Sequence, residues 1–418
     1  MEVKNINIET AKVSKWDKIY CELLKKIMTE GEIFENRTGI DTLSIEGVNF
    51  KLENIENNFP ILESKKVMIK NALSEILWIH QAQSNDVKWL EDRHNPIWEE
   101  WKIDDDGIYR IYDPFIESIE NLEDGQTMVL DVYGRPLKDK YLKNVYTDAT
   151  TKAKEKGKKL TKAIYYGKEY AGTIGTAYGY INNKFKRPQY VLKQLKENPN
   201  DRRMNIILWQ DEYIKTGVLP PCVWGTEWKV TNGKLHCYVH QRSADVPLGL
   251  PFNVSQYAIL LKMFAKASGL EAGSLNYSIM DAHIYVNQIE GINKQLDRYA
   301  NMKYFESLHN ETRECDVMNY YNTLKTQVER LKIYTENNPT KKEVLSEYKK
   351  VLEELQIFEF MYNKEKPKLE LADKNDFFEF NNEVNNDKEY LKENPTGNND
   401  IKLLNYTSLP FIKMPIAQ

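Results

Sequence analysis

One cysteine and the polar run that follows it have the composition of a nucleophilic site for an anionic heterocycle. Cys222 follows two prolines, and residues 240–253 read HQRSADVPLGLPFN. A thiol can attack an electrophilic carbon. Arg242 and Ser243 could bind anionic oxygens, and Asn253 offers a donor and an acceptor to a flat ring. These residue types predict covalent chemistry on a nucleotide.

Two predicted strands would bring Cys222 and Arg242 together. Apolar residues alternate on both sides of Asn232-Gly233, a pair that favours the tight type I′ turn of a β-hairpin. Pairing of these strands would place the thiol near the guanidinium. Asn253 precedes a helical pattern, so a helix N-cap is the structural alternative to a binding role.

Three further segments carry polar candidates. Arg37 lies in a predicted loop before a strand, where it could bind a phosphate or simply be exposed. Glu75 lies among apolar residues of a predicted helix over 70–82; a buried carboxylate there needs a partner or a raised pKa, and a solvated position is the alternative. Arg202 and Arg203 precede a β-like run and could grip a phosphate or form a surface ion pair.

The composition limits the classes of function. With 418 residues, 41% of them hydrophobic, the chain can bury a large core, and its net charge of -4 gives no general attraction to nucleic acid or anionic membranes. No apolar run is long enough to span a bilayer, and the four cysteines lack disulfide or metal spacing. We therefore expect a cytoplasmic protein with reduced thiols and no metal.

Other catalytic classes lack their motifs. The chain has no phosphate-loop motif and no dinucleotide-binding glycine motif after a strand, which argues against nucleotide hydrolysis and nicotinamide hydride transfer. A hydrolase built on Ser243, His283 and Asp245 would lack the GxSxG elbow. A cysteine nucleophile is the better hypothesis.

Two segments differ from their surroundings. Residues 102–170 are polar and end in the lysine-rich TKAKEKGKKLTK, which favours a solvated insertion over a nucleic-acid surface because aromatic residues are sparse there. Residues 316–363 show two helical patterns, with Thr340 and Glu343 placed for a capping box at the second. The apolar C-terminal tail is expected to pack on the body, near the site.

Taken in order, the sequence motifs resemble the thymidylate synthase family and its pyrimidine hydroxymethylase relatives. The motifs are NRTGIDTLSI, FPILESKK, the Glu75 helix, NPIWEEW, DRR, PPC, QRSADVPLGLPFN, DAHIY and KMPIAQ. The match covers three segments, about 13–101, 171–300 and 365–418. It leaves insertions at 102–170 and 301–364 within a single catalytic domain of residues 1–418.

The resemblance implies an α+β fold with a large twisted mixed β-sheet, flanking helices and two mainly helical or polar insertions. It also implies a homodimer in which Arg202 and Arg203 of one subunit complete the phosphate site of the other. The substrate would be dUMP and the co-substrate 5,10-methylenetetrahydrofolate, without a metal.

By position, the resemblance assigns catalytic roles. Cys222 would add to C6 of the pyrimidine, Arg242 would favour its thiolate form, and Glu75 would assist proton transfer. Asn253 would read the O4/N3 edge of uracil, where deoxycytidylate-specific relatives carry aspartate. Asp245 would bond the pterin.

The remaining implied contacts fall into two groups. Those to dUMP are Arg37, Arg202, Arg203, Gln241, Ser243, His283 and Tyr285. Those to the folate are Lys65, Ile97, Trp98, Trp101, Leu219, Gly249 and Phe252. For the two indoles, three residues apart, core packing is the alternative to folate binding.

Three departures from the synthase pattern concern the fate of the one-carbon unit. Val223 replaces a usual histidine, residues 181–183 read INN where synthases have QWR, and the chain ends at Gln418 rather than a small aliphatic residue. Hydroxymethylases share the first two features. The departures favour a dUMP hydroxymethylase of the kind encoded by phages, in which water adds to the exocyclic methylene group at C5 of the pyrimidine. The alternatives are a thymidylate synthase and, from another class, a catalytically weak binding protein.

Overall fold

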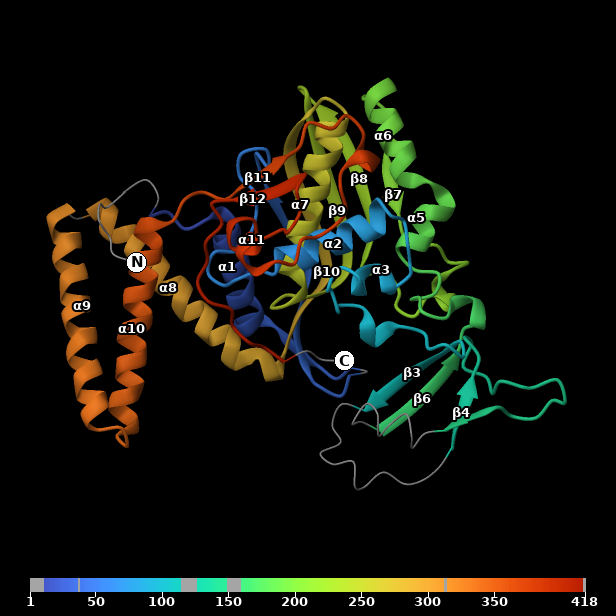
Figure 1. The fold of residues 1–418 in the computed structure, drawn as a ribbon, viewed down its shortest axis with the longest axis horizontal. Coiled ribbons are helices and arrows are strands. Elements are labelled where there is room, and N and C mark those ends of the chain that lie inside the picture. The colour runs from blue at the N-terminus through green and yellow to red at the C-terminus, as the bar shows by residue number, and fades with distance from the viewer. Residues whose placement is uncertain (1–10, 37, 114–125, 149–158, 312–313, 416–418) are drawn as a thin grey trace.

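The computed structural model describes residues 11–36, 38–113, 126–148, 159–311 and 314–415. Within them, a six-stranded mixed sheet in the order β1-β2-β10-β9-β8-β7 forms the centre of the molecule (Figure 1). The strands are β1 (Glu32–Phe34), β2 (Thr42–Leu52), β7 (Asn205–Ile207), β8 (Val223–Thr231), β9 (Lys234–Asp245) and β10 (Glu271–Tyr285). β9 and β10 are parallel, and the other neighbours are antiparallel.

The predicted hairpin is confirmed as β8 and β9. Both turn residues have positive φ, 51° at Asn232 and 71° at Gly233, as a type I′ turn requires. Alternate residues of β9, such as Cys237 and Val239, are buried. The alternation orients β9 so that one face of the sheet meets the helices.

Helices cover the buried face of the sheet. α7 packs on β9 and β10, α1 packs on β2, and α2 packs on α7. The predicted helix over 70–82 is confirmed as α2. The helices are α1 (Lys15–Glu30), α2 (Ile69–His80), α3 (Lys88–Glu91), α5 (Gly179–Phe185), α6 (Arg187–Glu197), α7 (Gly249–Ala267), α8 (Ile289–Glu311), α9 (Glu314–Asn337), α10 (Lys342–Asn363) and α11 (Lys388–Glu393).

Two parts of the chain project from the body, the helical hairpin of α9 and α10 on the left of Figure 1 and a small sheet at the lower right. The two helices predicted over 316–363 are confirmed. The predicted capping box is wrong, because Lys341 is the N-cap of α10 and its side chain makes no capping bond. The helix is instead held by packing of Val351 and Leu355 into the core.

The small sheet lies in the segment that the sequence marked as polar, for which no strands were predicted. Its order is β3-β6-β4-β5, and its own core consists of Ile108, Val129 and Ala163. The strands are β3 (Ile108–Asp113), β4 (Gln126–Leu130), β5 (Tyr146–Asp148) and β6 (Lys159–Tyr165). Most of the lysine-rich run lies outside the described residues.

Short elements complete the structure. A two-stranded sheet pairs β11 (Lys368–Leu371) with β12 (Ile401–Leu404). Single 3₁₀ turns are η1 (Glu99–Trp101), η3 (Lys168–Tyr170), η4 (Ile214–Thr216), η5 (Val286–Gln288) and η6 (Phe377–Glu379). In the described part of the chain, no helix is both long and apolar enough to span a bilayer. The α+β architecture with a large mixed sheet confirms the expected fold class.

Candidate active site

Strand register gathers most of the candidate side chains at one end of the central sheet. Cys222 directly precedes β8, and Val223 pairs with Gln241 of β9. On the next strand, Asp281 pairs with Ser243. The candidates from these strands therefore lie at the same end of the sheet, although they are up to about sixty residues apart in sequence.

Cys222 and Arg242 meet as predicted. The backbone N–H of Arg242 donates to the carbonyl of Cys222 (2.9 Å), and Nη2 of the same arginine lies 3.7 Å from Sγ. The guanidinium also donates to the carbonyls of Pro220 and Pro221, at 3.0 and 3.1 Å. Backbone carbonyls thus hold the cation beside the thiol, where a positive charge favours the thiolate.

A hydrogen-bonded chain of side chains runs from the sheet into the helical layer. Gln241 Nε2 donates to Asn253 Oδ1 (3.1 Å), and Asn253 Nδ2 donates to Gln256 Oε1 (3.2 Å). Gln256 Nε2 donates to Glu75 (2.5 Å), whose other oxygen accepts from Trp98 Nε1 (2.7 Å). This chain orients two groups suited to reading or protonating a heterocycle, an amide and a carboxyl.

The structure corrects the sequence interpretation of two residues in this series of hydrogen bonds. Asn253 is not a helix N-cap, because α7 begins four residues earlier, at Gly249, and Asn253 lies inside it. Glu75 is half-buried and hydrogen-bonded, not fully solvated. Burial raises the pKa of its carboxyl, while the bonds from Trp98 and Gln256 act in the opposite direction.

A second polar cluster lies on β9, β10 and β2. Asp281 accepts hydrogen bonds from Ser243 Oγ (2.8 Å) and from Ser44, and it lies 3.2 Å from His283 Nδ1. Burial alone would raise the pKa of Asp281, but the contacts from His283, Ser44 and Ser243 outweigh it and hold the pKa at about 2. Tyr285 packs edge-on against His283, with ring centroids 5.3 Å apart. The ionised Asp281 therefore fixes the orientation of two candidate substrate contacts.

Aromatic and apolar residues border this polar region. Trp98 is the N-cap of the single 3₁₀ turn η1 and Trp101 is its last residue, and their rings meet edge-to-face at 5.4 Å. Trp98 is almost buried, whereas Trp101 is half-buried. The other predicted folate contacts are also half-buried: Ile97, Leu219, Gly249 and Phe252. A flat co-substrate would meet partly exposed apolar side chains here.

Asp245 connects the site with the C-terminal tail. It accepts from the backbone N–H of Leu248 (3.0 Å) and from Gln288 Nε2 (3.2 Å), and burial raises the pKa of its carboxyl. Gln288 Nε2 also donates to the carbonyl of Pro415 (3.2 Å). The tail thus packs on the body beside the site, as the sequence predicted, and Gln418 lies outside the described residues.

Lys65 points inward. Its side chain is almost fully buried, and Nζ donates to the carbonyl of Pro247 and to the hydroxyl of Tyr20 (3.1 Å). Burial lowers the pKa of Lys65 to about 8, against the raising effect of nearby acidic groups that include Asp245. A lysine in this position supports the loop before α7, and its predicted contact with the folate stays a prediction.

The other arginines predicted to bind phosphate do not lie beside Cys222 within one chain. Arg202 and Arg203 are exposed, and Arg203 forms an ion pair with Asp201 (2.9 Å). They lie beyond the Asn205–Glu227 pair of β7 and β8, more than roughly 15 Å along the strand from Cys222. Arg37 lies outside the described residues.

Sequence reasoning missed Tyr178 as a site residue. Its hydroxyl accepts a hydrogen bond from the backbone N–H of Cys222 (3.0 Å), and burial raises its pKa well above the usual value. Its φ of 48° is rare for a tyrosine. Such a conformation depends on tertiary contacts and could not be predicted from the sequence. The only signal nearby in the sequence is the glycine at position 179, and in the structure a Cβ there would collide with Ser84.

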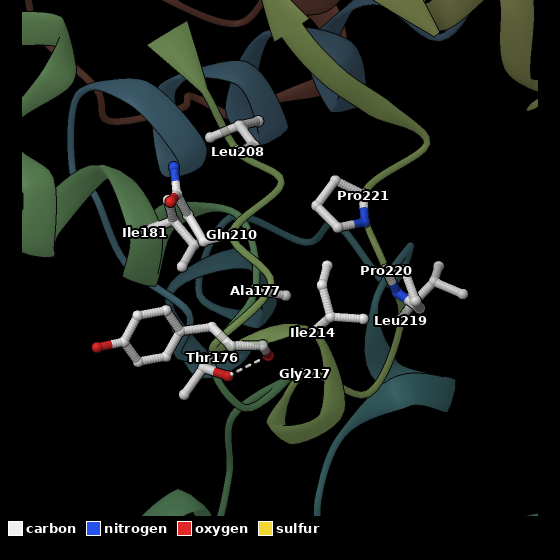
Figure 2. Close-up of a pocket in the computed structure, with 11 residues that line it drawn as sticks. Thr176, Ala177, Ile181, Leu208, Gln210, Ile214, Gly217, Leu219, Pro220 and Pro221 are labelled. Carbon is white, nitrogen blue, oxygen red and sulfur yellow. Dashed lines mark hydrogen bonds between the residues drawn. The ribbon is translucent and has the colours of Figure 1, made fainter. Parts of the chain in front are cut away.

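A small cavity lies behind the prolines that precede Cys222. Figure 2 shows Pro220 and Pro221 across it from Ile181 and Gln210. Its volume of about 10 Å³ has room for about one water molecule. In the described residues, no group of three or more His, Cys, Asp or Glu side chains is placed to hold a metal ion.

Comparisons with known proteins identify a matching family and several relatives. The family described as thymidylate synthase matches residues 18–346. A protein from Clostridium beijerinckii named thymidylate synthase is 34% identical over 286 residues, which cover 68% of this chain and 83% of that protein. Proteins of the same name from Listeria monocytogenes and Listeria innocua are 32% identical over 67% of this chain and 86% of theirs.

Proposed function

Because this chain belongs to the thymidylate synthase family and is thus a one-carbon transferase, we propose that it methylates C5 of dUMP with methylenetetrahydrofolate and forms dTMP. The observation that carries the proposal is the chain of hydrogen bonds from Gln241 through Asn253 to Glu75, next to the Cys222–Arg242 pair. An amide that could read a pyrimidine, a carboxyl group and a nucleophile at this end of the sheet would suit the proposed reaction.

In the proposed reaction, the Cys222 thiolate forms a bond to C6 of uracil, and the displaced electron pair makes C5 nucleophilic. C5 then attacks the one-carbon unit, and the bond from that carbon to the folate nitrogen breaks once the C5 proton has been removed. Glu75, whose pKa is raised by burial, assists removal of the C5 proton. Hydride from the tetrahydrofolate completes the methyl group, and the bond from Sγ to C6 breaks to release dTMP and dihydrofolate.

The proposed substrate contacts follow the two polar clusters. Asn253 is held on both sides by glutamines, so its amide can present a fixed donor and acceptor to the uracil edge. Gln241 Oε1 is buried without a partner among the described residues, which suits an atom that awaits a substrate donor. His283 and Tyr285 would bind the ribose hydroxyl, and Arg242 and Ser243 the phosphate.

The folate is proposed to lie against the apolar rim. Ile97, Trp101 and Phe252 each present a partly exposed apolar face there. Trp98 bonds Glu75 through its N–H and packs against Trp101, so it couples the rim to the carboxyl group. Asp245, next to the tail, would accept hydrogen bonds from the pterin.

The relatives favour a synthase over the hydroxymethylase that the sequence departures led us to expect. Val223, which stands in place of a histidine, is 4% exposed, and its aliphatic side chain has no polar atom to bind water as an imidazole would. Ile181, at another departure, lines the one-water cavity behind the prolines. These two observations keep 5-hydroxymethyl-dUMP as the second candidate product.

Product analysis separates the two reactions. Purified enzyme with dUMP and methylenetetrahydrofolate should yield dTMP by mass spectrometry and an equal amount of dihydrofolate by absorbance at about 340 nm. 5-Hydroxymethyl-dUMP without dihydrofolate would establish the second candidate. In a parallel sample, 5-fluoro-dUMP with the folate should form a covalent complex on Cys222, and failure to form it would contradict both reactions.

A homodimer is proposed because two of the expected phosphate contacts, Arg202 and Arg203, lie far from Cys222 within one chain. The face of the sheet opposite α7 carries half-exposed aromatic side chains, where His240 stacks on Trp224 and Tyr238. Met280 on the same face is 64% exposed. A second copy packed on this face would bury these residues and could bring its Arg202 and Arg203 to the site.

A further inference from the structure

A larger pocket lies away from the candidate active site, between the start of α1 and the chain that returns from α10. Its volume of about 410 Å³ lies within the roughly 300–1,000 Å³ typical of small-molecule sites. The walls come from residues 12–16, 52–53, 58–61, 63 and 364–367. None of the residues proposed to bind dUMP or the folate lines this pocket.

The walls of this pocket are largely apolar. They include two aromatic and two proline side chains, which suit a flat apolar group. The apolar lining residues are Val13, Trp16, Leu52, Phe59, Pro60, Ile61 and Pro367. Trp16 also has a buried indole N–H without a partner among the described residues, so the wall has an unused donor.

The polar lining residues give the pocket a positive balance. Four lysines and three glutamates line it. Glu63 and Lys364 form a buried ion pair, with side chains 3% and 6% exposed, and Lys15 pairs with Glu53 at 3.2 Å. Neither Lys12 nor Lys366 has an ion pair with another described residue. These two exposed lysines are therefore available to an anion, whereas the paired charges neutralise one another.

We propose that this pocket binds a small amphipathic anion. Its flat apolar part would lie against Phe59 and Pro367, and its anionic group would be held by Lys12 and Lys366. A single negative charge matches the excess of one lysine over the glutamates. The chemistry is that of an aromatic carboxylate or sulfonate.

The pocket wall is connected to the scaffold of the active site. Ser255 Oγ on α7 donates to the carbonyl of Pro60 (3.1 Å), two residues from Asn253. The C-terminal segment bonds the same stretch, since the backbone N–H of Leu409 donates to the carbonyl of Glu63 (2.8 Å). A bound anion would thus contact the segment that supports both α7 and the tail.

Fluorescence titration with 1-anilinonaphthalene-8-sulfonate, a flat apolar monoanion, tests the proposal on the full chain. We expect saturable binding, weakened at least about tenfold by Lys12→Glu with Lys366→Glu, because both contacts to the anion become repulsive. The matched control is Lys368→Glu, an exposed lysine of β11 that does not line the pocket and already pairs with Glu370. All three positions are exposed, so the variants should fold normally.

Two results would overturn the proposal. One is equal affinity of the probe for the wild type and the double variant, which would place the probe elsewhere. The other is competitive displacement by dUMP, with an apparent Kd that rises in proportion to the dUMP concentration. Binding that persists at saturating dUMP and is lost in the double variant supports it, and this result does not depend on whether the enzyme makes dTMP.

Discussion

Nη2 of Arg242 lies 3.7 Å from Sγ of Cys222, and the same guanidinium is anchored by the carbonyls of Pro220 and Pro221. The cation is therefore fixed by the backbone that carries the nucleophile, before any substrate is bound. Preorganised charge of this kind loses little to reorganisation during a reaction. The effect of the fixed cation should therefore be measurable in the reactivity of the Cys222 thiol without any substrate.

Arg242→Gln should slow the alkylation of Cys222 by iodoacetamide at pH 7 about tenfold, because the neighbouring cation no longer favours the thiolate. Peptide mass spectrometry measures the rate at this cysteine alone, and the buried Cys21 and Cys237 provide slow internal references. Arg135→Gln, in the small sheet segment, is the matched control. Equal rates in both variants would show that the 3.7 Å contact does not activate the thiol.

Trp98→Phe should move the acid limb of the pH profile of kcat/KM to higher pH. The indole N–H stabilises the charged form of Glu75, so its loss raises further a pKa that burial already raises. One hydrogen bond of about 1 kcal/mol corresponds to a shift of roughly 0.7 pH units. Trp101→Phe removes an indole of the same rim that does not bond Glu75, and its limb should stay in place. A shift to lower pH in Trp98→Phe would contradict the assigned role.

Asn253→Asp should change the nucleotide preference from dUMP towards dCMP. The amide is fixed between Gln241 and Gln256, so a carboxylate at this position would present acceptors to the amino group of cytosine and lose the donor to O4 of uracil. We expect the ratio of kcat/KM for the two nucleotides to shift by roughly a hundredfold or more, as sites built on hydrogen bonds discriminate strongly. An unchanged ratio would refute the proposed reading of the uracil edge.

The proposed dimer predicts complementation between two inactive variants. Cys222→Ser removes the nucleophile, and Arg202→Glu with Arg203→Glu removes the arginines offered to the partner. A mixed dimer has one site with both defects and one intact site, so refolding an equal mixture should restore roughly a quarter of wild-type activity. No recovery, with mixed dimers demonstrated by differential tagging, would mean that the arginines serve their own subunit or neither.

Local sequence patterns predicted most helices and strands of the body. The features that the sequence did not predict depend on contacts between distant segments. Asn232-Gly233 was enough to place Arg242 beside Cys222, because the turn type sets the register of its strands. The start of α7 could not be predicted, because Leu248 supplies no side-chain cap. Tyr178 and Gln256 were missed because their contacts join distant segments. The small sheet was missed because its strands are short and its core has few buried residues.

The buried pair of Glu63 and Lys364 predicts a pH-dependent stability. Burial raises the pKa of Glu63 from its usual 4.5 to about 7, and the charge of Lys364 opposes only part of this effect. A folded state that holds a proton more tightly than the unfolded chain is most stabilised where the proton is bound. This contribution is therefore full below about pH 4.5 and is lost as the pH rises to about 7.

Glu63→Gln should remove this loss of stability at rising pH. The free energy of unfolding of the variant relative to wild type should rise between pH 5 and pH 8 by about 2 kcal/mol, measured by urea unfolding at both values. The comparison must be a difference between proteins, because burial also lowers the pKa of His80 to about 3, which makes stability fall below neutral pH in both. Glu365→Gln, exposed two residues beyond Asn363 on the same return segment, should show no such change. An equal pH dependence in wild type and Glu63→Gln would place the proton of the folded state on another group.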